Sequence, residues 1–101
     1  SAAIAQEHHH PPQDAAIHDK FYSTWQRPDD RRYSCCNKHD CAPAMAAEKR
    51  GGVWWAQRAS DLKWLPIPHE KVERERDSPD PRAHMCSIGD TVFCFIAGSG
   101  S

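Results

Sequence analysis

The sequence predicts an α+β domain, in which an N-terminal helix packs on a small antiparallel sheet of three or four strands and disulfides staple the two together. Three observations lead to this fold class. Apolar residues recur at helical spacing after Pro12, the second half alternates short aromatic or β-branched runs with turn residues, and five cysteines occur in 101 residues. Small chains dense in cysteine are typical of disulfide frameworks.

Composition limits the size of the core and the kinds of partner. Only 39% of the residues are hydrophobic and the mean hydropathy is -0.82, so covalent links would add needed stability to a single small domain. Thirteen basic and fourteen acidic residues give a net charge of -1, which argues against nucleic acid as a partner. No apolar run reaches the roughly 18 residues of a membrane span.

The first thirteen residues read as the remnant of an export signal followed by a flexible arm. Ala3-Ile4-Ala5 has small residues at the two positions that a signal peptidase reads. We therefore expect a periplasmic or secreted protein. The arm carries His8, His9 and His10, whose imidazoles can take up copper, nickel or zinc; the alternative is a solvated arm with no metal role.

Residues 14–96 are expected to form the disulfide-stapled domain, beginning with the helix. Ile17, Phe21 and Trp25 recur every four residues and would give this helix an aromatic face of three to four turns. Asp14 places negative charge in the first turn, and Pro28 ends the helix.

The middle of the chain predicts two paired strands and one ambiguous segment. Residues 42–50 read as a short helix, or residues 44–49 read as a strand with Arg50-Gly51-Gly52 as its hairpin turn. Residues 53–58 form a strand, and residues 63–67 form the returning strand. Pro66 cannot donate a ladder hydrogen bond, so the returning strand should lie at an edge.

The last third predicts a loop, a central strand and a tail. Residues 69–82 alternate carboxylates with arginines, which is the composition of a solvated face. Residues 91–96 are apolar on both faces, with Val92, Cys94 and Ile96 on one and Phe93 and Phe95 on the other, so we expect this strand in the middle of the sheet. Residues 97–101 have the composition of a flexible tail.

The disulfide candidates are Cys35, Cys36, Cys41, Cys86 and Cys94. The sequence cannot select the pairing, but Cys35 and Cys36 are adjacent and should point to different partners. The preferred arrangement joins Cys41 to Cys86 and either Cys35 or Cys36 to Cys94.

A metal site is the competing interpretation of the cysteines. Cys36 and Cys41 have nearly the spacing of a zinc-ligand pair, and His39, His84 and Cys86 would complete the set. Catalysis has little support, because the chain lacks the nucleophile elbow, the phosphate loop, the metalloprotease pair of histidines and the redox pair of cysteines. We therefore expect no enzyme, although a thiol redox factor stays an alternative.

Trp54, Trp55 and Trp64 are the candidate partner-binding residues. Neighbours on a strand point to opposite faces, so one of Trp54 and Trp55 enters the core beneath the helix and the other needs a cover or a partner. The alternative is that all four tryptophans, Trp25 included, fill the core.

The chain resembles a group of small exported cysteine-rich bacterial proteins of unknown function. The resemblance spans residues 21–96 and rests on the motifs Phe21-Tyr22-Ser23-Thr24-Trp25, Ser34-Cys35-Cys36, Asp40-Cys41, Trp64-x-x-Ile67-Pro68, Pro79-Asp80, His84-Met85-Cys86 and Val92-Phe93-Cys94-Phe95. It implies a periplasmic or secreted single-domain protein and no activity. Asp80-Pro81 departs from the Asp-Gly common in that group, which puts the turn there in doubt.

These observations together predict a non-catalytic exported binding module or accessory subunit with a protein partner and no required cofactor. The alternatives are a periplasmic protein that binds or delivers copper or zinc through the histidine arm and a thiol, and a thiol-based redox factor.

Overall fold

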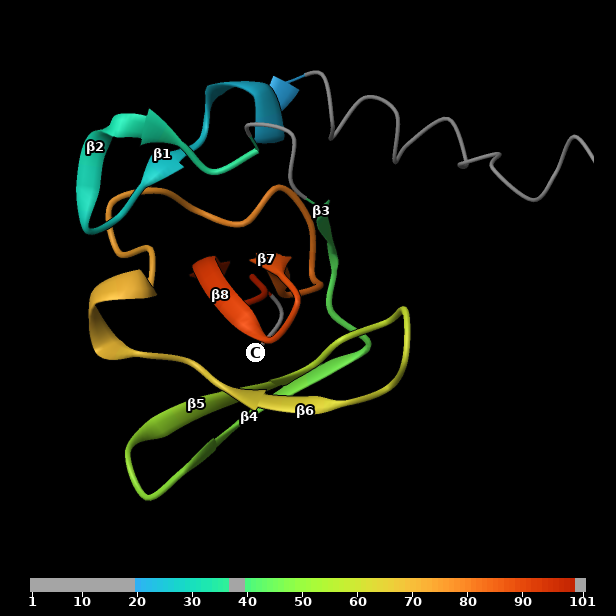
Figure 1. The fold of residues 1–101 in the computed structure, drawn as a ribbon. Helices are drawn as coiled ribbons and strands as arrows, with labels where there is room; N and C mark the ends of the chain where they lie inside the picture. The colour runs from blue at the N-terminus through green and yellow to red at the C-terminus, as the bar shows by residue number, and fades with distance from the viewer. Residues whose placement is uncertain (1–19, 37–39, 100–101) are drawn as a thin grey trace, which may run out of the picture.

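A computed structural model describes residues 20–36 and 40–99, and Figure 1 shows them as three layers. The first layer holds a 3-10 turn η1 (Tyr22–Thr24) and the pair β1 (Gln26–Arg27) and β2 (Asp30–Ser34). The middle sheet has the order β3 (Asp40–Pro43), β7 (His84–Ile88), β8 (Thr91–Ile96). The third layer is the sheet β4 (Ala46–Arg50), β5 (Val53–Gln57), β6 (Trp64–Pro66), and a second 3-10 turn, η2 (His69–Lys71), follows it.

The middle sheet places three cysteines side by side. Cys41 on β3 pairs with Cys86 on β7, and Cys86 pairs with Cys94 on β8. Residues that are opposite in an antiparallel pair share a face of the sheet, so all three face the first layer. This row is where both disulfides are made.

A bulge divides β8 between the two faces of the middle sheet. Cys86 pairs with Cys94 but Ser87 pairs with Val92, so β8 has one more residue, Phe93, than the stretch of β7 that faces it. Val92 consequently packs with Phe95 on the side of the third layer, while Cys94 and Ile96 face the first layer. The expectation that Val92 shares a face with Cys94 is wrong because the bulge resets the alternation.

The third layer begins with a two-residue hairpin. Gly51 and Gly52 both have positive φ, 59° and 83°, which is the requirement of the tight turn that joins β4 to β5. Of the two interpretations of residues 42–50, the strand is right and the helix is wrong. The strand at β6 does lie at an edge, as its proline predicts.

Two apolar clusters fill the spaces between the layers. One lies between the middle sheet and the first layer and holds Phe21, Tyr22, Trp25, Cys35, Cys86, Cys94 and Ile96. The other lies between the middle sheet and the third layer and holds Ala44, Ala56, Leu65, Ile67, Val72, Ala83, Met85, Val92 and Phe95.

The predicted α+β class is wrong for the described residues, whose elements are eight strands in three small sheets and two 3-10 turns. The helix expected from residue 14 lies outside the described residues up to position 19. From Trp25 onward the chain is extended, because the Trp25 carbonyl accepts a 2.8 Å hydrogen bond from the Cys35 amide and Gln26 pairs with Ser34. Tertiary hydrogen bonds override a helical pattern here.

The expectation that residues 91–96 lie in the middle of the sheet is also wrong, since β7 holds that place and β8 is an edge. The two clusters bury both faces of β8, and the loop 69–82 covers its free edge. Val72 bridges Phe95, and the Glu73 amide donates to the Phe95 carbonyl at 2.7 Å. This loop was expected to be solvated, but it covers the edge of β8 and buries Glu73.

Candidate functional site

The outward surface of the third layer carries two tryptophans. Along β5, Trp54 and Ala56 point toward the middle sheet, so Trp55 between them points away from it. Trp64 pairs with Gln57, two positions along from Trp55, and therefore lies on the same outward face. Both indoles are half-buried, so part of each ring is accessible to solvent.

Arg50 lies over both of these tryptophans. Its guanidinium carbon is 5.0 Å from the Trp55 ring centroid and 4.6 Å from the Trp64 ring centroid. Its Nε donates to Glu48 Oε2 at 2.8 Å, which fixes the side chain along β4. We call Glu48, Arg50, Trp55 and Trp64 the aromatic face.

The aromatic face has side chains that are common in binding surfaces. A guanidinium stacked on two indoles presents a flat apolar area with donors at its rim. Tryptophan and arginine are the residues that most often dominate the energy of protein interfaces. The ionisable groups of this face are Arg50 and Glu48, and they are paired with each other.

Trp54 does not belong to this surface. Its ring is 5.4 Å from the Phe95 ring and packs against the cluster between the middle sheet and the third layer, with Lys49 Nζ 5.6 Å from its centroid. One of the neighbouring tryptophans does enter the core, but it packs on the middle sheet and not beneath an N-terminal helix. Trp25 is fully buried in the other cluster.

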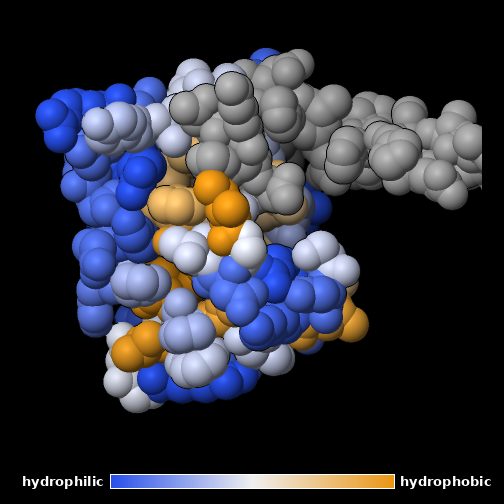
Figure 2. Space-filling view, in the orientation of Figure 1, coloured by the Kyte–Doolittle hydropathy of each residue, from blue (hydrophilic) through white to orange (hydrophobic). Residues whose placement is uncertain are grey.

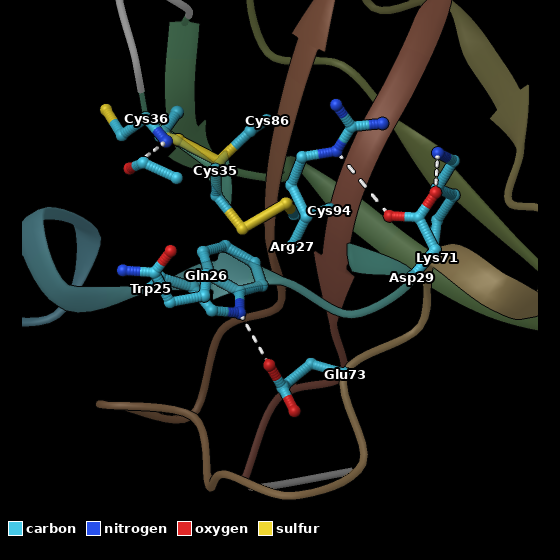
Figure 3. The surroundings of a disulfide bond; sticks show 12 residues. Trp25, Gln26, Arg27, Asp29, Cys35, Cys36, Lys71, Glu73, Cys86 and Cys94 are labelled. Carbon is cyan, nitrogen blue, oxygen red and sulfur yellow. Dashed lines mark hydrogen bonds and ion pairs between the residues drawn. A yellow bond between two sulfur atoms is a disulfide. The ribbon is translucent and has the colours of Figure 1, made fainter. Parts of the chain in front are cut away.

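Four of the five cysteine candidates form two disulfides. Cys41 is bonded to Cys86 across β3 and β7, and Cys35 of the first layer is bonded to Cys94 of β8. These are the pairs of the preferred arrangement, with Cys35 and not Cys36 as the partner of Cys94. Figure 3 shows the Cys35–Cys94 bond beside the indole of Trp25, whose Nε1 points to Glu73.

The disulfides remove the zinc set proposed from the sequence. Cys41 and Cys86 are bonded to each other in a disulfide. Both ring nitrogens of His84 are hydrogen-bonded, Nδ1 to the Tyr22 hydroxyl at 2.7 Å and Nε2 to Asp80 Oδ1 at 2.9 Å. Within residues 20–36 and 40–99 no group of three metal-ligating side chains occurs. His39 and the arm with His8, His9 and His10 lie outside the described residues.

The hydrogen bonds of His84 on β7 reach Tyr22 in the first layer and Asp80 in the loop before β7. His84 is fully buried, and the tautomer that satisfies both ring nitrogens has Nε2–H donating to Asp80 Oδ1 while Nδ1 accepts from the Tyr22 hydroxyl. Burial raises the pKa of Asp80, but hydrogen bonds from Arg82 and His84 outweigh it and hold that pKa below its ordinary value. These hydrogen bonds link Tyr22 of the first layer to His84 of the middle sheet, and His84 to Asp80 in the loop before it.

Sequence reasoning missed Arg50. A signal for it exists, because a two-residue turn at Gly51-Gly52 sets Arg50 opposite Val53 and therefore on the face of Trp55. The tryptophans can be singled out by residue type alone. Arg50 can be placed beside them only when the register of the hairpin is known.

Neither a scan of known protein families nor searches of characterised proteins and solved structures finds a match to this chain. No helix in the described part of the chain is long and apolar enough to cross a membrane. Two disulfides in so small a protein point to an oxidising, exported location.

Proposed function

We propose that this protein is a non-catalytic binding module of the periplasm or the extracellular space, an accessory subunit that contacts a protein partner through the aromatic face. The observation that carries the proposal is the stacking of Arg50 on Trp55 and Trp64 on a sheet surface that no other described layer covers.

The energetics favour a protein over a small ligand at this surface. The face is the flat outer side of a sheet, and flat surfaces bury area efficiently only against another extended surface. The Arg50 guanidinium already stacks on both indole rings, so a partner would contact Arg50, Trp55 and Trp64 as one surface. The paired charges of Arg50 and Glu48 leave the centre of the face apolar with donors at its edge, which matches the anatomy of an interface.

The test begins by trapping the partner in the native envelope. A photo-reactive amino acid at position 53, beside the aromatic face, should crosslink to one protein, while the same group at position 32 on β2 should not. With that partner purified, Trp55→Ser and Trp64→Ser should each weaken binding at least tenfold, about 1.4 kcal/mol.

Tyr33→Ser is the matched control, because Tyr33 is an exposed aromatic residue on the first layer. It should leave the affinity unchanged. The proposal fails if the tryptophan variants bind like the parent protein while their unfolding midpoints are also unchanged, or if crosslinking at position 53 yields no protein product.

A further inference from the structure

Arg27 on β1 has a guanidinium whose two terminal nitrogens make no hydrogen bond to any residue that the structure describes. Its contact with a carboxylate runs through Nε, which lies 3.5 Å from Asp29 Oδ1 as an ion pair without a hydrogen bond. Nε is buried, whereas the terminal nitrogens reach solvent and the whole side chain is 25% exposed. Figure 3 shows the terminal nitrogens on the side of the guanidinium that faces away from Asp29. This edge of the guanidinium is open to a ligand.

Two aromatic rings and an ion pair hold the Arg27 guanidinium in place. Its central carbon is 4.8 Å from the Phe93 ring centroid and 5.9 Å from the Tyr33 ring centroid. Lys71 Nζ lies 5.7 Å from the centroid of the same Phe93 ring and is paired with Asp29 Oδ2. An arginine that is already oriented by its neighbours loses less conformational entropy when it binds a ligand.

The charges around Arg27 leave one positive charge unbalanced. Arg32 and Asp30 satisfy each other, with Nε donating to Oδ1 at 2.9 Å and Nη2 to Oδ2 at 2.8 Å. Arg27 and Lys71 share the single carboxylate of Asp29. A monoanion would balance the remaining charge, whereas the second charge of a dianion would be repelled by Asp29 and by Asp30, which lies opposite Arg27 in the β1–β2 pair. The planar pair of terminal nitrogens matches the two oxygens of a carboxylate.

The surface beside Arg27 is polar and carries one exposed ring. Tyr33 is 53% exposed. Figure 2 shows hydrophilic residues over the left side of the molecule, where Figure 1 places β1, β2 and η2. A ligand on this open surface has one side against Tyr33 and the other side in water. A sugar ring suits both environments, because its C–H face packs on an aromatic ring while its hydroxyls stay hydrated.

We propose that Arg27 and Tyr33 bind a hexuronic acid sugar. The carboxylate of the sugar accepts hydrogen bonds from Arg27 Nη1 and Nη2, and the C–H face of its pyranose ring packs on the Tyr33 ring. The site lies on the first layer, shares no residue with the aromatic face and does not depend on the function proposed for that face.

The first test titrates the intact protein with methyl glucuronide, followed by the backbone amide shifts of Arg27, Arg32 and Tyr33. The shifts should saturate. Methyl glucoside, which has the same ring without the charge, should bind about tenfold more weakly. Acetate, which lacks the ring, and glucose 6-phosphate, a dianion, should each bind at least about threefold more weakly.

The comparison ligands also define failure of the proposal. Acetate that binds as tightly as methyl glucuronide would overturn it in favour of any carboxylate, acidic peptides included. Glucose 6-phosphate of equal or higher affinity would show a general anion site, and methyl glucoside of equal affinity would show that the charge has no role.

The second test uses variants. Arg27→Lys keeps the charge but removes the paired donors, so methyl glucuronide should bind about fivefold more weakly. Tyr33→Ser, at an exposed position, should weaken binding about threefold. Arg32→Lys is the matched control on the neighbouring strand and should keep the affinity within about twofold, because the guanidinium of Arg32 is already paired with Asp30.

Unfolding midpoints of the three variants show whether any loss comes from misfolding. Unchanged affinity in Arg27→Lys would overturn the proposal. If Arg27→Lys proves unstable, Tyr33→Ser decides, and parent-like binding of methyl glucuronide by that variant would equally overturn it.

Discussion

At the scale of single residues, Glu73 is a buried carboxylate that accepts four hydrogen bonds. Its carboxylate accepts from Arg31 at 2.7 and 2.8 Å, from Trp25 Nε1 at 2.9 Å and from the Glu75 amide at 2.8 Å. Burial raises the pKa of Glu73, but these hydrogen bonds outweigh it and lower the pKa to about 2. The residue therefore ties the first layer to the loop that covers β8.

We expect Glu73→Gln to lower the free energy of unfolding at pH 7 by about 2 kcal/mol, because an amide cannot satisfy Arg31 and Trp25 as a carboxylate does. Urea unfolding followed by tryptophan fluorescence measures this. Glu75→Gln is the matched control: Glu75 also contacts Arg31, at 3.2 Å, but its side chain is 80% exposed. An equal effect of the two substitutions would contradict the role of burial.

The same residue predicts a pH dependence. Because its pKa is lower in the folded protein than in the unfolded chain, Glu73 contributes stability above pH 4.5 that is lost as the pH falls toward 2. The difference in unfolding free energy between pH 7 and pH 3 should therefore be smaller in Glu73→Gln than in the parent protein. Identical pH profiles for the two proteins would count against this assignment.

At the scale of elements, the β4–β5 hairpin is an element whose turn follows from its local sequence, Gly51-Gly52. Gly51 and Gly52 supply the positive φ values that a two-residue turn requires, which favours the strand over the helix for the segment before them. The first layer shows the opposite case. Phe21 and Trp25 have helical spacing and are buried as that spacing predicts, but the backbone of Trp25 is extended because it pairs with Cys35.

We expect Gly52→Val to lower the free energy of unfolding by about 1–2 kcal/mol, because valine is strained at φ +83°. No atom lies within 4 Å of a Cβ added there, so the effect comes from the backbone alone. Gly51→Asn, at φ +59°, should be nearly neutral, since asparagine tolerates this region. Thermal unfolding of both variants checks the difference, and an equally destabilising asparagine would refute it.

At the scale of the whole molecule, the two disulfides differ in what they join. Cys41–Cys86 links strands that the backbone already pairs, whereas Cys35–Cys94 links the first layer to the middle sheet. In the chain-entropy model each contributes about 4 kcal/mol by restricting the unfolded chain. Their effect on the motion of the folded protein should nevertheless differ.

Replacing Cys35 and Cys94 together by alanine should increase hydrogen exchange over residues 20–36 more than replacing Cys41 and Cys86 does. Exchange followed by mass spectrometry under native conditions measures this. The intact mass of the parent protein without reductant should be lower than the reduced mass by two hydrogens for each disulfide. Equal exchange in the two double variants would show that the first layer is held by its other contacts.

The sequence by itself determined local features: the β5 and β6 strands, the edge position that Pro66 predicts, and a density of cysteines that is typical of disulfide frameworks. These depend on neighbours in the chain. Only the tertiary structure decided the division into three sheets, the edge position of β8, the burial of Glu73 and the stacking of Arg50 on Trp55 and Trp64. Each of these features depends on hydrogen bonds and packing between segments that are distant in the sequence. Local sequence patterns do not specify which distant segments come into contact.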